Sequence, residues 1–563
     1  MTRRLSDRSL KVFLFCTTFA TYSAAGYWLQ VRHGFILGDA LSRVSAAQAV
    51  LFSRDPHLAA IGFIFTPLSA LLQIPAIGLG RLWPELTERA FSGSLISAVF
   101  MAGAAVQILG MGIDRGLARP YVLAITLLFA FNPMILFYGS NGMSEAPFIF
   151  FISWAVRRLI LWMRDDDVHH LVTAGGIAMG LAYLTRYDAL ACIAAAGVLV
   201  GTTTYLRARP APRMRRAMLD FLMVSGPGVV AFMGWAAISW LITGEAFAQF
   251  TSQYGNTAIL AQSGQSKPTF GHGLEFAATC TMLLAPALIP VGACAVSRRW
   301  RCPSWTAILP PVALYGAALG FQSLSYAMGS TFPFLRFYIV AIPFTACLSM
   351  LAVPDKTGAA VKRRGKYAPA LPHPRPSTSR HPRAVPVGVV AVLAISVPVT
   401  LWGMRQPRYA PQEYALGAVL SPQPDSVSDR AATERSIAAS FSTEREIAHY
   451  LDGLALPEGS VIVDTEYGFA IVAASHHPKT FVVPSDLDFV TDLDEPVKNG
   501  IKYLLAVPRV GRGTVDALNL RYPTLYDTGA NVATLELEIP NNGDNQPNWR
   551  LYRVNQAASE LAS

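Results

Sequence analysis

An early polar segment carries the residues of this chain that are best suited to chemistry. Residues 31–69 contain Asp39, Arg43, Asp55 and His57, and apolar sequence flanks the segment on both sides. A carboxylate such as Asp39 can act as a general base toward an attacking hydroxyl, and desolvation near a lipid edge would raise its pKa into the useful range. Asp is also favoured as a helix N-cap, and a helical pattern follows Asp39, so both roles are open.

The run Asp55-Pro56-His57 lies in the same segment. A carboxylate and an imidazole can bind a metal or a sugar hydroxyl. Asp before Pro also favours a turn, and for His57 the turn is the better interpretation.

Charged residues recur at the ends of later apolar stretches. Glu145 ends GSNGMSE, where it either reaches the site or stabilises a helix N-terminus. Arg186 and Asp188 share the turn LTRYDA and are expected to pair with each other. Arg336, in FPFLRFYIV, either grips a phosphate with its planar guanidinium or extends to the lipid interface.

The composition is that of a polytopic α-helical membrane protein. The chain has 563 residues, of which 52% are hydrophobic and only 15% charged, against about a quarter charged in soluble domains. The charge deficit lies in the first 404 residues. The net charge of +10 indicates cytoplasmic loops that face anionic lipid, and no basic patch with interleaved aromatic residues indicates nucleic acid. No P-loop, GxSxG or HExxH motif is present.

Eleven apolar runs approach the length of about 20 residues that crosses a bilayer. The segment 59–80 is also apolar and is either a twelfth span or a helix on the outer surface. The eleven runs are 11–30, 92–113, 121–138, 147–163, 171–185, 188–206, 218–242, 272–296, 305–326, 336–353 and 386–404.

The positive-inside rule decides between these alternatives. If 59–80 does not cross, nearly all loop arginines and lysines fall on one side, including those of the basic loop 354–385. If it crosses, the bias disappears. We therefore predict a multi-pass protein of the plasma (inner) membrane with a cytoplasmic N-terminus, an external loop at 31–91 and a cytoplasmic loop at 354–385. Another polar external loop, 243–270, is long enough to cover a site or is only a connector.

The last part of the chain, 405–563, has a different composition. A polar helix-like stretch at 431–454 precedes five β-like runs: SVIVDT, TFVVP, IKYLLAVP, ATLELEIP and WRLYRV. Strands mixed with helical stretches favour a small α/β or α+β domain. The sequence thus predicts two domains, a membrane domain at 1–404 and an extracytoplasmic α/β domain at 405–563.

The order of these features resembles the GT-C superfamily of membrane glycosyltransferases, and in particular the polyprenyl-phosphate-sugar-dependent mannosyl- and arabinosyltransferases of actinobacteria. The matching features are an early acid in the first external loop, a Pro-Leu surface helix, and three later motifs in the expected order. The resemblance covers about residues 11–353. The motifs are GDALSR, FTPLSALL, SEAPF, LTRYDAL and RFYIVAIPF.

The resemblance implies a GT-C-like fold and an inverting sugar transfer from a polyprenyl-phosphate donor to a cell-envelope glycan or lipoglycan. By position, Asp39 would be the catalytic base, and Arg336 and Arg186 would bind the donor phosphate. Many members have an adjacent acidic pair where this chain has Asp39 and Ala40, so use of a divalent metal stays open. No other cofactor is expected. The residues left to support the acceptor or the site are Arg43, Asp55, His57 and Glu145.

Two other classes of protein fit the same composition. A transporter or flippase of a lipid-linked sugar would place charges at the membrane midplane between repeats. Here the charges gather in loops on one face, which favours surface chemistry. The third class is a non-catalytic assembly protein whose C-terminal part is a binding module.

Overall fold

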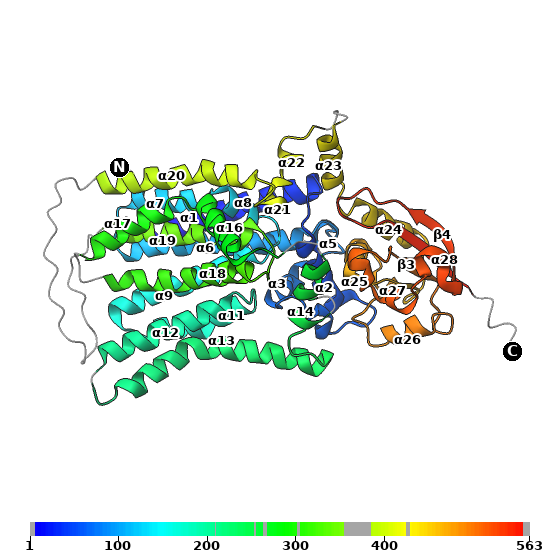
Figure 1. The fold of residues 1–563 in the computed structure, drawn as a ribbon, viewed down its shortest axis with the longest axis horizontal. Coiled ribbons are helices and arrows are strands. Elements are labelled where there is room, and N and C mark those ends of the chain that lie inside the picture. Colours follow the sequence, from blue (N-terminus) through cyan, green and yellow to red (C-terminus); the bar gives the residue numbers. More distant parts are fainter. Residues whose placement is uncertain are drawn as a thin grey trace.

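The chain folds into a long helical body with a smaller domain at one end (Figure 1). The structure is a computed structural model that describes residues 6–208, 210–252, 255–262, 267–300, 305–353, 384–423 and 428–555. The N-terminus lies at the end of the body that is remote from the smaller domain (Figure 1). The basic loop 354–385 lies outside the described residues except for its last two.

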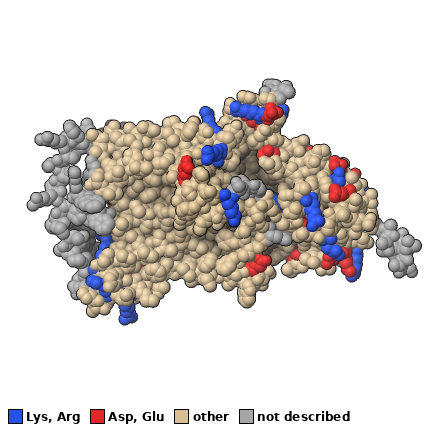
Figure 2. Space-filling view, in the orientation of Figure 1, with Lys and Arg blue, Asp and Glu red and all other residues tan. Residues whose placement is uncertain are grey.

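Within the described residues, seven helical stretches are long and apolar enough to cross a membrane, or eight if one bent pair counts as a span. Charged side chains are sparse along the helical body on the face drawn in Figure 2 and gather over the smaller domain. The stretches are α6 (Phe91–Asp114), α9 (Glu145–Asp165), α12 (Ala189–Arg207), α13 (Arg213–Thr243), Thr306–Ala327 with α18 (Leu309–Ala327), Leu335–Ala352 with η5 (Leu335–Tyr338) and α19 (Ala341–Ala352), and α20 (Ala384–Met404). The bent pair is α16 (Phe270–Leu284) and α17 (Leu288–Trp300), with an 81° bend.

The three other predicted spans are also helical but are shorter, broken or more polar. They are α1 (Asp7–Gly26) with η1 (Tyr27–Arg32), α7 (Arg119–Ala130) with α8 (Pro133–Tyr138), and the run of α10 (Val168–Leu171), η3 (Val172–Met179) and α11 (Gly180–Tyr183). The predicted fold class is therefore confirmed in its coarse form, a mainly helical membrane protein with a small C-terminal sheet domain. The count of eleven spans stays a prediction.

The loops that the charge bias assigns to the cytoplasm lie together. Arg119 Nη2 contacts Asp7 Oδ1 at 2.7 Å, which places the 114–119 loop beside the N-terminus. On the other side of that loop, Arg157 Nε contacts Asp114 Oδ2 at 2.7 Å. The 114–119 loop thus lies beside the start of α1 and beside α9, and the alternation of loops across the membrane stays a prediction.

Segment 31–91 folds into short helices between the helical body and the smaller domain. They are α2 (Gly38–Phe52), η2 (Leu58–Ile61), α3 (Leu68–Leu71), α4 (Ile74–Ile77) and α5 (Glu85–Glu88). A four-residue helix is far below the length of about 20 residues that a span needs. The segment 59–80 therefore forms only short helices, and its place on the outer surface stays a prediction.

A glycine sets how closely the helical body approaches this segment. Gly142 has φ +82°, and a Cβ on it would lie 3.1 Å from Ala40 Cβ and 3.4 Å from Gly93 Cα. Such a backbone conformation and such closeness both require glycine. The small residues of GSNGMSE thus let the start of α2 pack directly against the ends of the membrane helices.

The smaller domain has one five-stranded mixed sheet in the order β2-β1-β3-β5-β4. Each strand occupies one of the five predicted β-like runs: β1 (Val461–Ile462), β2 (Phe481–Val482), β3 (Tyr503–Ala506), β4 (Ala533–Ile539) and β5 (Trp549–Val554). β1 pairs in parallel with β2 and β3, whereas β5 pairs antiparallel with β3 and β4. Val461 faces one apolar core and Ile462 the other, as the alternation of side chains along a strand requires.

Helices cover both faces of this sheet. α24 (Ser442–Gly453) and α25 (Thr465–Ala474) pack on one face, and α26 (Phe489–Asp494), α27 (Ala517–Arg521) and α28 (Leu525–Thr528) pack on the other. The predicted helix-like stretch at 431–454 is divided in two, because Phe441 adopts φ +60° between α23 (Asp429–Ala438) and α24. The domain is joined to α20 through α21 (Pro411–Tyr414) and α22 (Gly417–Leu420).

The smaller domain is docked on segment 31–91 by an apolar cluster and an arginine. Leu41 and Val44 of α2 share a buried cluster with Ala470 and Ala473 of α25. Arg54, just after α2, contacts three carboxylates of the smaller domain, those of Asp486, Asp488 and Asp492. These contacts hold α2, and with it Asp39, in a defined position.

A buried acid in the smaller domain gives its stability a pH dependence. Burial and the charge of Asp464 raise the pKa of Asp516 to about 8, above the value of about 3.9 expected in the unfolded chain. The folded state therefore binds this proton more tightly, so the stabilisation is complete below about pH 3.9 and is lost as the pH rises through 8. Asp516→Asn keeps the cap on the Asn519 amide and stays neutral.

We expect Asp516→Asn to melt above the wild type at pH 9, by about 2–4 °C per kcal/mol for a domain of this size. The difference shrinks toward pH 5. Thermal unfolding of the full chain followed by fluorescence across this pH range measures it. Asp527→Asn, at an exposed acid of the same domain, is the control, and an Asp516→Asn profile parallel to that of the wild type contradicts the prediction.

Candidate active site

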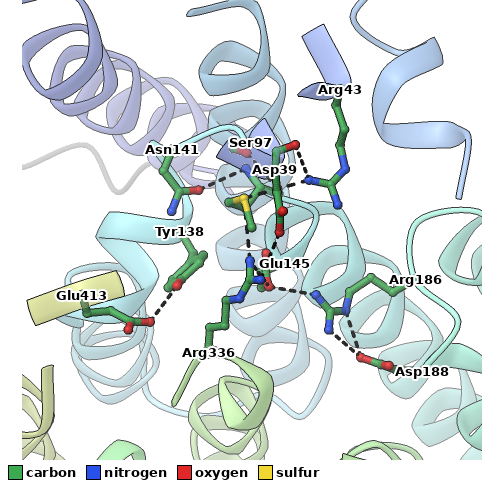
Figure 3. A network of polar contacts seen from close by, with 11 residues as sticks. Asp39, Arg43, Ser97, Tyr138, Asn141, Glu145, Arg186, Asp188, Arg336 and Glu413 are labelled. Atoms are coloured by element: carbon green, nitrogen blue, oxygen red, sulfur yellow. Dashed lines mark hydrogen bonds and ion pairs between the residues drawn. The ribbon is translucent and has the colours of Figure 1, made fainter. Parts of the chain in front are cut away.

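Five charged side chains from four separate segments form a continuous chain of ion pairs (Figure 3). Asp39 Oδ2 lies 3.1 Å from Arg336 Nη2, and Arg336 Nη1 lies 3.7 Å from Glu145 Oε1. The same Glu145 oxygen accepts from Arg186 Nη1 at 2.8 Å. Arg186 Nη2 then reaches Asp188 Oδ2, also at 2.8 Å. The predicted Arg186–Asp188 pair is thus present as part of a larger network.

The three acids of this network lie at the beginnings of three helices. Asp39 is in the first turn of α2, Glu145 is the first residue of α9, and Asp188 immediately precedes α12. Helix N-termini carry a partial positive charge that stabilises carboxylates. Arg336, in η5, and Arg186, in the turn before α12, then bridge the acids. Glu145 thus lies in the first turn of α9 and also contacts both arginines of the network.

Asp39 is the member of the network that solvent reaches. Its side chain is 40% exposed, whereas that of Arg336 is 6% exposed and that of Glu145 only 1%. The alternative role of Asp39 as a helix cap is wrong, because the N-cap of α2 is Leu37 and no side chain caps this helix. The Asp39 carboxylate is therefore partly exposed to solvent.

The electrostatics of Asp39 differ from the sequence-based expectation. Burial acts to raise the pKa of Asp39, but the positive charges of Arg336 and Arg43 outweigh it, and the pKa is held below its ordinary value. The expected upward shift by desolvation is therefore wrong for the free protein. Two guanidinium groups within reach of one carboxylate stabilise its charged form more than partial desolvation penalises it.

Arg43 orients Asp39 from within the same helix. Arg43 Nη1 donates to the backbone oxygen of Asp39 at 2.8 Å. Its guanidinium lies over the ring of Phe65, 4.2 Å from the centroid. The Sδ atom of Met143 lies 4.0 Å from Arg43 and 3.8 Å from Arg336. Arg43 thus supports the site from the side.

The buried network has unused hydrogen-bonding capacity. Among the described residues, Arg336 Nε, Glu145 Oε2 and Asp188 Oδ1 are buried without a hydrogen-bond partner. Leaving such groups unpaired costs about 1–3 kcal/mol each. Each such group in a folded protein calls for an explanation, and a catalytic role is one of them.

The smaller domain and the loop 243–270 both reach this end of the helical body. Arg512, which pairs with Glu466 in the smaller domain, is close enough to lower the pKa of Asp39 further. Within the loop, α15 (Asn256–Gln262) packs against η7 (Gly511–Thr514), which carries Arg512. The ring of Phe250, in α14 (Ala248–Thr251), contacts that of Tyr187 at 5.3 Å. These contacts favour a covering role for the loop 243–270 over the role of an inert connector.

Asp55 and His57 belong to the domain interface. His57 Nδ1 contacts the backbone oxygen of Asp55 at 2.7 Å, and Asp55 Oδ2 accepts from the Leu487 amide at 3.4 Å. In the described part of the chain, no ion pair or hydrogen bond joins either residue to the network. α2, which ends at Phe52, lies between Asp39 and these two residues, and their predicted support of an acceptor or a metal stays a prediction.

Sequence reasoning missed a second polar pair beside the network. Tyr138 Oη donates to Glu413 Oε1 at 2.6 Å, and both side chains are buried. Burial raises the pKa of Glu413, partly offset by the Tyr138 hydrogen bond. Glu413 follows the last apolar run at a distance similar to that of Asp39 from the first, which is the signal that could have found it. Nothing in the sequence marks Arg512.

No protein-family model matches the sequence, and no curated protein matches it. Among solved structures, it is similar to the apo oligosaccharyltransferase of Archaeoglobus fulgidus, with 12% identity and a TM-score of 0.42 over 97% of this chain and 75% of that chain. It is also similar to the archaeal oligosaccharyltransferase AglB from Archaeoglobus fulgidus in complex with an inhibitory peptide and a dolichol-phosphate, with 13% identity and a TM-score of 0.44 over the same shares. Both identities are below 25% and both TM-scores are below 0.5. No residue role is therefore carried over from these structures.

Proposed function

We propose that this chain is a membrane glycosyltransferase of the GT-C type. It transfers a sugar, mannose or arabinose, from a polyprenyl-phosphate donor to a cell-envelope glycan or lipoglycan on the outer face of the membrane. The observation that carries the proposal is the pair formed by a solvent-accessible carboxylate, Asp39, and a buried guanidinium, Arg336, 3.1 Å apart at the end of the helical body. This pair combines a base with a phosphate ligand where lipid meets water.

The reaction follows from the charges of these two groups. The acceptor hydroxyl oxygen attacks the anomeric carbon, and its proton passes to the Asp39 carboxylate. The bond between that carbon and the phosphate oxygen breaks, and the polyprenyl phosphate leaves with the electron pair. A single displacement of this kind inverts the anomeric centre. The leaving phosphate needs little acid assistance, so base and phosphate ligand together suffice.

Donor binding should also raise the low pKa of Asp39. A phosphate that binds Arg336 through two parallel hydrogen bonds competes with Asp39 for the same guanidinium. Once Arg336 is engaged, Asp39 loses its main counter-charge and becomes a stronger base. Arg186, which shares Glu145 with Arg336, is the second proposed ligand of the donor phosphate.

The test is sugar transfer by the purified protein in lipid nanodiscs. Polyprenyl-phosphate mannose and arabinose are supplied in turn with envelope glycan acceptors, and products are identified by mass spectrometry. A new glycosidic bond supports the proposal. Translocation of an intact lipid-linked sugar in proteoliposomes without a new glycosidic bond identifies a flippase instead. If neither activity is found, the remaining class is a non-catalytic assembly protein.

The pH dependence of the reaction tests the exchange of Arg336 between Asp39 and phosphate. Activity requires ionised Asp39, so it falls as the pH drops through its pKa. The acidic limb of kcat/KM reports the free protein, in which that pKa is low, and the limb of kcat reports the donor complex. We expect the acidic limb of kcat to lie at a higher pH than the acidic limb of kcat/KM.

Arg512→Gln removes a positive charge near Asp39 and should move both limbs upward by up to about half a pH unit. Arg509→Gln, at an exposed arginine of the same loop, is the matched control. Coincident limbs for kcat and kcat/KM in the wild type would contradict the exchange.

A further inference from the structure

Three metal-binding side chains converge at the edge where segment 31–91 meets the smaller domain. Glu88 ends α5, His449 lies in α24, and His476 follows α25. One ligand atom from each lies within 4.8 Å of the other two. Among the described residues, no hydrogen bond or ion pair joins these three side chains to the network of Asp39.

The distances match those between the ligands of one metal ion. His476 Nε2 lies 3.0 Å from Glu88 Oε1, and His449 Nε2 lies 3.7 Å from the same oxygen. Ligands about 2.1 Å from a tetrahedral zinc lie about 3.4 Å from one another. The Nε2 atoms of both histidines thus face the same Glu88 oxygen.

The backbone fixes the two histidines relative to each other. Asp452, one turn after His449 on α24, accepts from the His476 amide at 2.8 Å and from Ser475 Oγ at 2.6 Å. The rings of His449 and His476 lie 5.8 Å apart. Their side chains are 52% and 53% exposed, and that of Glu88 is 15% exposed. The backbone that carries the imidazoles is therefore held rigidly, and the imidazoles themselves are open to solvent.

We propose that Glu88, His449 and His476 bind one Zn²⁺ ion, with water as the fourth ligand, and that this ion clamps the smaller domain to segment 31–91. Two imidazoles and one carboxylate are a ligand set that zinc prefers. Arg89 and Arg445 lie near Glu88 and oppose the cation. The expected affinity is accordingly that of an open site and lies below that of a closed structural zinc site.

The test is zinc binding by the full-length protein in detergent after removal of metal with a chelator. Isothermal titration with ZnCl₂ should give one site, and zinc should raise the melting temperature. His449→Ala and His476→Ala should each weaken binding by at least about tenfold, since each removes one of three protein ligands. Glu88→Gln can still accept a hydrogen bond from His476 but loses the charge, so it should weaken zinc binding as well.

His477→Ala is the matched control, because His477 is the exposed neighbour of His476 and lies outside the ligand set. It should bind zinc like the wild type. All three ligand positions keep access to solvent, and size-exclusion chromatography checks that the variants remain folded. The proposal is overturned if the wild type binds no zinc, or if the His449→Ala/His476→Ala double variant binds it equally well.

Discussion

Replacing Asp39 by Asn is expected to lower the rate of sugar transfer by about 10²–10⁴-fold, the usual effect of losing a general base. Asn has nearly the same size and cannot accept the proton of the acceptor hydroxyl. Arg336 keeps Glu145 as a partner at 3.7 Å, and the N-cap of α2 is Leu37. Expression and folding should therefore stay normal while turnover is lost.

The measurement is initial transfer rate with saturating polyprenyl-phosphate sugar, with donor binding measured separately. Asp55→Asn is the matched control, an acid of the same segment whose carboxylate contacts the smaller domain at Leu487. It should transfer sugar at the wild-type rate. An Asp39→Asn protein that works within a few-fold of the wild type shows that another group is the base.

Arg336→Lys should weaken donor binding by about 10–100-fold, because one charged hydrogen bond contributes about 1.5–3 kcal/mol. Lys keeps the positive charge but loses the planar fork that matches a phosphate. The charge also keeps the buried Glu145 carboxylate paired, so the fold should survive. Arg336→Ala leaves that carboxylate without this neighbour and should bind donor still more weakly.

Donor affinity is measured by titrating the purified variants with polyprenyl phosphate. Arg408→Lys is the control, because Arg408 is an exposed arginine beyond the end of α20 that contacts the ring of Tyr409. Its affinity should equal that of the wild type. Unchanged donor affinity in Arg336→Ala would reject the phosphate role.

The membrane helices could be predicted because their signal is local. A run of apolar residues must become a helix in lipid, where every backbone group needs an internal partner. All eleven predicted spans contain helices, and the five β-like runs became the five strands. The break at Phe441 was not predictable from pattern, since its left-handed backbone follows from how α23 and α24 pack.

The site was predictable in part, and the reason is energetic. Asp39, Glu145, Arg186 and Arg336 were selected because charges at a membrane edge are costly and therefore pair, and the structure joins them in one network. Asp55 and His57 have the same residue types, yet the rigid length of α2 carries them away. Spacing along the chain did not contain that information.

By itself the sequence determined the helical segments, the strands, the separation of charged loops and the five charged residues that meet. Only the tertiary structure decided their partners, the accessibility of Asp39 and the direction of its pKa shift. It also decided the contributions of Arg512 and of the Glu88, His449 and His476 group, which come from segments up to 388 residues apart. Periodicity and hydropathy report interactions within one element, whereas an ion pair depends on the distance between elements, which packing alone sets.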